Sequence, residues 1–253
     1  MTTFERLLSA RPEGGAAFWV LIDPDRHTPE EAAERAADAE DAGADAVLVG
    51  SSILTTSNFH SAMKRIAAAV SVPVVIFPGG VAQVSGDADA ILLLSLISGR
   101  NPQLLIGEHV QAAPALKSLA LEPISTGYIL VESGTLTTVE YISDTRPIPR
   151  RKPEIAMAHA LAAEYLGMKT VYLDAGSGAG QPVPPEMIEA VSSYVTVPLI
   201  VGGGIRTGET AEAAVRAGAS FIVVGNALEK TAGHSLLSEL SAAVHEPAAP
   251  GGS

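Results

Sequence analysis

Eight short apolar runs recur along the chain, each three to five residues long and rich in Val, Ile and Leu. Each run is too short for a helix and is typical of a strand buried on both faces, as in parallel sheets. The runs are Phe18–Ile22, Ala46–Val49, Val74–Phe77, Ala90–Leu94, Tyr128–Val131, Thr170–Leu173, Leu199–Val201 and Phe221–Val224. The sequence therefore predicts eight parallel strands.

Between most of these runs lie Ala- and Glu-rich stretches with helical spacing. In the clearest one, Pro29–Ala42, Thr28 is placed as an N-cap and Gly43 follows the last turn. The others are Asn58–Val70, Pro153–Leu166, Pro185–Tyr194 and Gly208–Ala217. Such alternation over 253 residues predicts an α/β fold, a closed (β/α)8 or TIM barrel. We expect a single domain over residues 1–245 and a disordered tail over 246–253.

An internal similarity indicates that one helix of this barrel is missing. Val72–Gly80 resembles Val197–Gly204. In the later segment, 20 residues separate Pro198 from Gly218, the glycine before the next strand. In the earlier segment, only 13 residues separate Pro73 from the corresponding Gly86. The difference is about two helical turns. We therefore expect no third helix, an irregular crossing over Gly79–Asp89, and an open flank where a long apolar ligand can lie.

Glycine-rich pieces follow the last three predicted strands, within Tyr172–Gly178, Val201–Arg206 and Val224–Asn226. Small residues let backbone N–H groups approach an anion closely. In such barrels the loops after the seventh and eighth strands commonly hold a phosphate. The pattern favours a phosphate-bearing small molecule, and the alternative is that the glycines only form tight turns.

Composition excludes several other classes of protein. The net charge of −12 argues against partners held by bulk electrostatics, such as nucleic acid or an anionic membrane. The chain has no Cys, so disulfides and thiolate metal sites are excluded. No signal-like segment is present in residues 1–15, and the longest apolar stretch, Ala90–Ile97, is too short to span a bilayer. We expect a cytoplasmic protein without stable membrane insertion.

Several motifs together resemble one enzyme family. They are Leu21–Asp25, Val49–Ser52, Phe77–Gly79, Gly127–Glu132, Pro147–Pro153, Ala163–Gly167, Tyr172–Gly178, Gly202–Arg206 and Gly225–Asn226. Over most of the barrel the chain resembles the geranylgeranylglyceryl phosphate synthases, the prenyltransferases of archaeal-type ether lipid synthesis. Bacterial heptaprenylglyceryl phosphate synthases are relatives of this family, which also lacks the third barrel helix.

The resemblance implies a reaction, its substrates and an assembly. The 3-hydroxyl of sn-glycerol 1-phosphate would be joined to a polyprenyl diphosphate, with release of diphosphate. The motif set is closer to the geranylgeranyl enzymes, which favours a C20 donor. The family forms dimers or hexamers, so a homo-oligomer is expected.

A diphosphate leaving group requires charge neutralisation, which Mg²⁺ bound by one or two protein oxygens provides. Asp23, after the first strand, is a suitable ligand, and Ser52 matches the family's second ligand position. Asp25 is the rival carboxylate. The alternatives are an Asp-Pro turn for Asp23 and a turn or N-cap role for Ser52.

Tyr172 and Asp174 are the candidate catalytic residues. Residues i and i+2 of a strand point to the same side, so both side chains can enter the barrel mouth. A phenol can orient the glycerol, and a carboxylate can accept its proton. The family usually has Glu where this chain has Asp174, so a bridging water or a turn-capping role stays open.

The resemblance also implies a substrate-binding set that includes these two residues. The set is Tyr172, Leu173, Asp174, Ala175, Gly176, Ser177, Gly178, Gly203, Gly204, Gly225 and Asn226. A short helix over Ala227–Lys230 would follow the last of them. Glu132 and the basic loop residues Arg146, Arg150, Arg151 and Lys152 are further candidates, the loop as a lid on the diphosphate or as a surface that forms salt bridges.

Two other function classes are compatible with a phosphate-binding barrel. The first is a sugar-phosphate isomerase or a cyclase of histidine synthesis, which would need acid and base carboxylates on opposite strands. The second is a non-catalytic phosphate- or lipid-binding protein. Metal-dependent turnover would distinguish an enzyme from such a binder.

Overall fold

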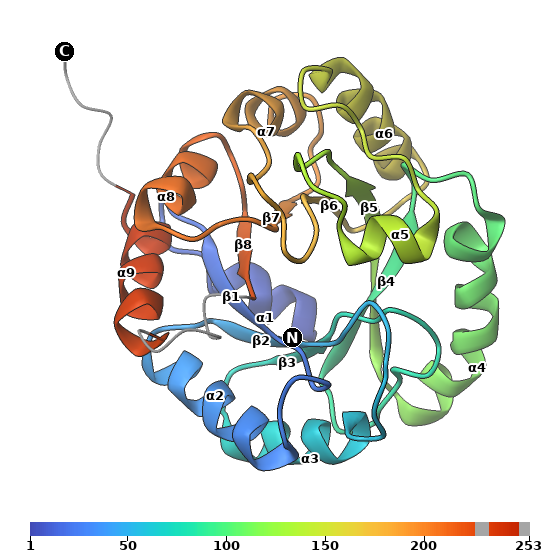
Figure 1. Cartoon of the computed structure of the whole chain (residues 1–253), viewed down its shortest axis with the longest axis vertical. Helices are drawn as coiled ribbons and strands as arrows, with labels where there is room; N and C mark the ends of the chain where they lie inside the picture. Colours follow the sequence, from blue (N-terminus) through green and yellow to red (C-terminus); the bar gives the residue numbers. More distant parts are fainter. Residues whose placement is uncertain (226–232, 248–253) are drawn as a thin grey trace.

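The computed structural model describes residues 1–225 and 233–247, and in it the eight predicted strands form one closed parallel barrel. The strands follow one another around the barrel in chain order, and β8 pairs with β1 to close it (Figure 1). They are β1 (Ala17–Ile22), β2 (Ala46–Val49), β3 (Val74–Ile76), β4 (Ala90–Leu96), β5 (Glu122–Leu130), β6 (Thr170–Asp174), β7 (Leu199–Gly202) and β8 (Phe221–Val224). The predicted TIM barrel is confirmed.

Helices surround this barrel, as Figure 1 shows. They are α1 (Thr3–Ser9), α2 (Pro29–Asp41), α3 (Phe59–Ala69), the π-helix η1 (Gln103–Gly107), α4 (Glu108–Leu119), α5 (Thr138–Ser143), α6 (Pro153–Tyr165), α7 (Pro185–Ser192), α8 (Gly208–Arg216) and α9 (Gly233–His245). Five of the predicted helices correspond to α2, α3, α6, α7 and α8, and the other helices that the structure describes were not predicted.

The start of α2 shows how the sequence sets these boundaries. The Thr28 hydroxyl accepts the Glu31 N–H at 3.2 Å, and the Glu31 carboxylate accepts the Thr28 N–H at 2.8 Å. This reciprocal capping box satisfies two N–H groups that a helix start leaves free. The predicted N-cap at Thr28 is confirmed.

Strand alternation divides the core into two layers. In β1, Phe18 and Val20 belong to the layer between barrel and helices, whereas Ala17 and Trp19 belong to the layer inside the barrel. Trp19 is fully buried and stacks on Phe221, with ring centroids 4.3 Å apart. Side chains such as Trp19 and Phe221 therefore fill the interior of the barrel and leave no open channel through it.

Helix α1 closes the opposite end of the barrel. Leu7 is completely buried in the inner layer. The Glu122 carboxylate, at the start of β5, accepts the Thr3 N–H at 2.6 Å and so fixes the first turn of α1. Because α1 covers the end where the strands begin, the open end is the one where they finish.

The predicted absence of the third helix is confirmed. Residues 77–89, all described by the structure, cross from β3 to β4 without a helix. One flank of β4 therefore lacks the helical cover that most other strands have.

Asn226 and the expected helix Ala227–Lys230 lie outside the described residues, as does most of the expected tail, 248–253. The predicted domain boundary at residue 245 stays a prediction. Of the helices that the structure describes, none has both the length and the apolar character needed to cross a membrane.

Candidate active site

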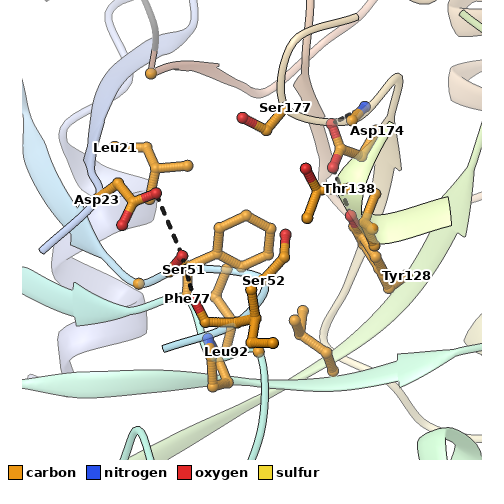
Figure 2. Close-up of a pocket in the computed structure, with 18 of the residues that line it drawn as sticks. Leu21, Asp23, Ser51, Ser52, Phe77, Leu92, Tyr128, Thr138, Asp174 and Ser177 are labelled. Carbon is orange, nitrogen blue, oxygen red and sulfur yellow. Dashed lines mark hydrogen bonds between the residues drawn. The ribbon is translucent and has the colours of Figure 1, made fainter. Parts of the chain in front are cut away.

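A cavity of about 480 Å³ opens at the carboxyl ends of the strands. One part of its lining is polar and comes from the loops after β1, β2, β6, β7 and β8. The other part is mainly apolar and comes from β4, η1, α4 and α5, although α4 also contributes Glu108 and His109 and α5 also contributes Thr138 and Ser143. Figure 2 shows two polar groups facing each other across the cavity: Asp23 with Ser51 on one side, and Asp174 with Tyr128 on the other, with Phe77 between them.

Glycines of the loops after β6 and β7 form one corner of the cavity. Gly176, Gly178, Gly203 and Gly204 all have φ between +75° and +90°, which side-chain-bearing residues rarely adopt. A Cβ on Gly203 would lie only 2.6 Å from the Gly176 backbone nitrogen. The two loops therefore touch through their backbones, and small residues are required to form this corner.

Gly225 completes the corner under different constraints. It lines the cavity at the end of β8, and its φ lies outside the left-handed range. A Cβ there would lie 3.6 Å from Leu21, an ordinary contact. Only a demand for space beside a ligand would require glycine at this position.

The predicted run Tyr172–Gly178 divides between the two faces of β6. Tyr172, Asp174, Gly176, Ser177 and Gly178 line the cavity. Leu173 and Ala175 instead pack in the layer between barrel and helices, fully buried, and do not line it. Alternation along the strand explains why these two side chains turn away from the cavity, and their place in the substrate-binding set stays a prediction.

Asp174 is a buried carboxylate with hydrogen bonds to both of its oxygens. Its Oδ1 accepts the Gly176 N–H at 2.8 Å, which is the turn-capping role left open above. Its Oδ2 accepts the Tyr128 hydroxyl at 2.5 Å. Burial raises the pKa of Asp174, although both hydrogen bonds oppose the rise.

Tyr128 belongs to the motif Gly127–Glu132, but the sequence analysis assigned it no role in the site. It lies on β5 directly opposite Tyr172 in the strand register, and its ring meets the ring of Tyr172 edge to face at 5.5 Å. Phe77 stacks on Tyr172, with centroids 5.3 Å apart. Strand alternation could have indicated this position. Tyr128 is two residues before Leu130, which pairs with Asp174, so the Tyr128 and Leu130 side chains point to the same side of β5.

Asp23 faces the cavity from the end of β1. Its Oδ2 accepts the Ser51 hydroxyl at 3.2 Å and lies 3.3 Å from Nε of Arg26. Its Oδ1 accepts the Asp25 N–H at 3.0 Å, as the alternative Asp-Pro turn requires. Ser52 also lines the cavity, but the hydroxyl bonded to Asp23 is that of its neighbour Ser51.

The donor chemistry around Asp23 fits one kind of metal site. The described residues contain no group of three or more His, Asp or Glu side chains that could enclose an ion. Mg²⁺, however, is commonly held by one or two carboxylates together with substrate phosphates. A partly exposed carboxylate with the Ser51 hydroxyl beside it suits that second mode.

The rival carboxylate, Asp25, is engaged in holding a loop. Its oxygens accept hydrogen bonds from the backbone and hydroxyl groups of Thr55 and Thr56. Burial alone would raise the pKa of Asp25, but these hydrogen bonds outweigh that effect and lower it. Asp25 thus orders the loop after β2.

The apolar part of the cavity wraps around β4. Leu92, Leu94 and Leu96 lie on one face of this strand, and Ile91 and Leu93 lie on the other, yet all five line the cavity. This is possible because no helix covers β4 where the third helix is missing. The far wall is formed by Leu104, Ala112, Val139 and Ile142.

The long loop after β5 covers the cavity with its helix α5 and not with its basic residues. Its helix α5 contributes Thr138, Val139, Ile142 and Ser143 to the lining. The structure describes the whole basic cluster, and none of its four residues lines the cavity, nor does Glu132. Instead, Arg150 donates to the carbonyl oxygens of Glu132 and Pro182. The covering segment is therefore apolar and hydroxyl-bearing.

Comparison with known proteins agrees with this geometry. The model of the PcrB family matches residues 13–244. A geranylgeranylglyceryl phosphate synthase of Chitinophaga pinensis is 49% identical over 97% of this chain and 96% of its own length. Its namesake from Thermococcus kodakarensis is also 49% identical, over 89% of each chain.

Solved structures extend the similarity to the fold. The (S)-3-O-geranylgeranylglyceryl phosphate synthase of Thermoplasma acidophilum, crystallised in complex with its substrate sn-glycerol-1-phosphate, is 35% identical with a TM-score of 0.92. The alignment covers 97% of this chain and 99% of that one. The tryptophan synthase alpha chain of Legionella pneumophila, 15% identical with a TM-score of 0.62, shares the fold alone. The chain therefore belongs to the PcrB family, among whose enzymes are the geranylgeranylglyceryl phosphate synthases.

Proposed function

We propose that this chain transfers a prenyl group from a polyprenyl diphosphate to the 3-hydroxyl of sn-glycerol 1-phosphate and releases diphosphate. The observation that carries the proposal is one cavity in which a glycine-lined corner, a buried carboxylate and an apolar lobe are continuous. The name of the relatives and the substrate bound to the Thermoplasma acidophilum enzyme support the same reaction.

The phosphate of the glycerol substrate would bind at the glycine corner. Gly203, Gly204 and Gly225 bring backbone N–H groups to the cavity wall without side chains in the way. Such local donors are needed because the chain carries a net charge of −12 and provides no general attraction for anions.

The glycerol 3-hydroxyl would then lie toward Tyr172 and Asp174. A carboxylate placed there accepts the hydroxyl proton as the oxygen attacks the first carbon of the prenyl group. Burial favours this role, because it raises the pKa of Asp174 and makes its carboxylate a stronger base.

The diphosphate would bind on the opposite side, beside Asp23. Mg²⁺, when held there, would supply the positive charge that a leaving diphosphate requires. Asp23 is the proposed carboxylate ligand, and the hydroxyls of Ser51 and Ser52 are within the same wall of the cavity. Arg26, which pairs with Asp23, adds a positive charge at this wall.

The prenyl chain would extend into the apolar lobe along β4. The lobe is lined by leucines of β4 and closed by Val139 and Ile142 of α5, which keep water from the allylic carbon. A C20 chain remains the favoured donor, on the strength of the family resemblance. The expected dimer or hexamer also stays a prediction.

The proposal is tested by incubating the full chain with sn-glycerol 1-phosphate, Mg²⁺ and prenyl diphosphates of graded length, with mass analysis of the products. The expected product is a prenylglyceryl phosphate ether, formed fastest from the C20 donor and lost when the metal is chelated. Hydrolysis of the donor without ether formation, or the absence of any product, would contradict the proposed transfer.

A further inference from the structure

Asp174 lines the cavity, and both of its carboxylate oxygens are already engaged in hydrogen bonds within the protein. Oδ1 faces the turn, where it accepts the Gly176 N–H, and a Cβ on Gly203 would approach it to 2.7 Å. Oδ2 is covered by the Tyr128 hydroxyl. The side chain of Asp174 is only 5% exposed in total. Because Tyr128 also lines the cavity, its phenol lies between Oδ2 and a substrate hydroxyl that approaches from the Tyr128 side.

Of the two tyrosines in the cavity wall, only Tyr128 is placed to mediate this contact. A Cβ on Gly202 would lie 2.4 Å from the Tyr172 hydroxyl, so that hydroxyl lies against β7. The Tyr128 hydroxyl instead points to Asp174, as the dashed line in Figure 2 shows. The Tyr128 ring is held edge to face by Tyr172 and Phe77, at centroid distances of 5.5 and 6.0 Å.

We propose that Tyr128 is a catalytic residue that passes the proton of the glycerol 3-hydroxyl to Asp174. This inference rests on the proposed transfer reaction and names the group that touches the reacting oxygen. As the glycerol oxygen bonds to the first prenyl carbon, the bond from that carbon to the diphosphate breaks and its electron pair leaves with the diphosphate. The glycerol proton moves to Oη of Tyr128, and the phenolic proton of Tyr128 moves to Oδ2 of Asp174.

The two proton movements must occur together. Burial, with the nearby Asp174 carboxylate, holds the pKa of Tyr128 well above 10, so the phenol does not ionise on its own at neutral pH. With its proton already hydrogen-bonded to Oδ2, the phenol can give up that proton as it receives another. The side chain of Asp174 is one carbon shorter than the Glu that the resembling family usually has. The phenol of Tyr128 bridges this difference in length between the carboxylate and the substrate.

Tyr128→Phe tests this role by removing one oxygen and leaving the ring. We expect kcat to fall by about 10²- to 10⁴-fold, as for a lost acid–base group, with the KM for sn-glycerol 1-phosphate changed less than about threefold. Tyr165→Phe is the matched control, because Tyr165 is 78% exposed on α6 and far from this chemistry. The control should keep full activity and show that loss of a phenol oxygen alone is harmless.

Rescue distinguishes a relay from a structural role. In the double variant Tyr128→Phe with Asp174→Glu, the longer arm reaches the substrate directly, so at least a tenfold recovery of kcat over Tyr128→Phe is expected. A fully active Tyr128→Phe would overturn the inference while leaving the transfer reaction intact. So would a low kcat that Asp174→Glu does not restore in a variant of unchanged Tm. If the unmodified chain forms no ether, the proposed function itself has failed.

Discussion

Asp174 serves both the backbone and the chemistry of the cavity. Its Oδ1 caps the turn at Gly176, and its Oδ2 accepts the phenol of Tyr128. Burial raises its folded-state pKa, so the folded protein binds this proton more tightly than the unfolded chain does. The stability contributed by this group is therefore lost as the pH rises through the folded pKa. The ionised form of Asp174, which acts as the base, is the form that burial disfavours.

Asp174→Asn separates these two roles. Asn keeps an oxygen for the Gly176 N–H but cannot take up a proton, so kcat should fall by about 10²- to 10⁴-fold. Because the buried charge is also removed, Tm at neutral pH should stay the same or rise. Steady-state kinetics and thermal melts of the variant check both statements. An Asn variant that is active and stable would leave Asp174 as a turn cap only.

Gly225→Ala probes the phosphate corner without backbone strain. The added methyl group meets only an ordinary contact with Leu21 but occupies cavity space, so the KM for sn-glycerol 1-phosphate should rise by roughly tenfold. The KM for the prenyl donor and the Tm should hardly change. An equal rise for both substrates would contradict a phosphate site at Gly225.

Gly203→Ala is the structural counterpart of that variant. Its φ of +79° costs about 1–2 kcal/mol for a residue with a side chain, and its Cβ would lie 2.6 Å from a backbone nitrogen. We expect Tm to fall by at least about 3 °C, measured by calorimetry. A variant with normal Tm would show that the two loops are not in contact as described.

Asp23→Asn tests the metal side of the cavity. Removing the only proposed carboxylate ligand should reduce kcat by at least about 10²-fold at any Mg²⁺ concentration, while circular dichroism stays unchanged. Asp25→Asn is the matched control: it should lower Tm by loosening the loop at Thr55 but keep the response to Mg²⁺. The reverse pattern would move the metal to Asp25.

Sequence alone selected Asp23 and Asp174, the two carboxylates of the candidate site, but not all of their hydrogen-bond partners. It selected Ser52, yet Ser51 bonds to Asp23, because both follow the end of β2, where strand alternation no longer fixes which side chain turns inward. Tyr128 was overlooked as a functional residue because its position against Asp174 depends on the pairing of β5 with β6. Such cross-strand register is set by the closed barrel rather than by neighbours in sequence.

At the scale of elements, the buried strands were the most predictable part. Seven of the eight are short apolar runs with both faces covered, and their predicted positions agree with the structure to within two residues. The exception is β5, which begins at Glu122, six residues before the predicted run Tyr128–Val131. Helix α4 was not predicted; it carries Pro114 in its interior and follows a π-helical turn, Gln103–Gly107. Helix α5 has only six residues, too few for a periodic pattern, although Thr137 caps it.

Helix α9 ends with an ion pair that should make stability depend on pH. His245 Nε2 lies 2.7 Å from the Asp45 carboxylate, and this hydrogen bond raises the pKa of His245 above 6.5. The stabilisation is fully present below the unfolded-state pKa and is lost as the pH rises through the folded one. A partly exposed ion pair contributes less than about 1 kcal/mol to the free energy of unfolding. Because this contribution is lost as His245 gives up its proton, the Tm should fall by about 2 °C from pH 6 to pH 8.

His245→Gln provides the comparison for that measurement. The variant should melt lower than the unmodified chain at pH 6 and approach it at pH 8, because Gln cannot take up a proton. Melting curves of both proteins across this range are needed. Identical pH dependence in the two would show that the pair does not contribute.

At the scale of the whole molecule, a missing helix turns a phosphate-binding barrel into one with an apolar lobe. The spacing of the sequence predicted the absent helix, and the cavity around β4 follows from it. The preferred prenyl length could not be predicted in the same way. It depends on how side chains from β4, η1, α4 and α5 meet at the far wall, and these segments are distant in sequence.

The central claim is that the glycerol 3-oxygen attacks the prenyl carbon, with cleavage of the bond from that carbon to the diphosphate. Labelling the 3-hydroxyl of sn-glycerol 1-phosphate with ¹⁸O tests it directly. After incubation with Mg²⁺ and geranylgeranyl diphosphate, mass spectrometry should find the label in the prenyl ether and none in the released diphosphate. Label in the diphosphate, or an ether without label, would contradict the account.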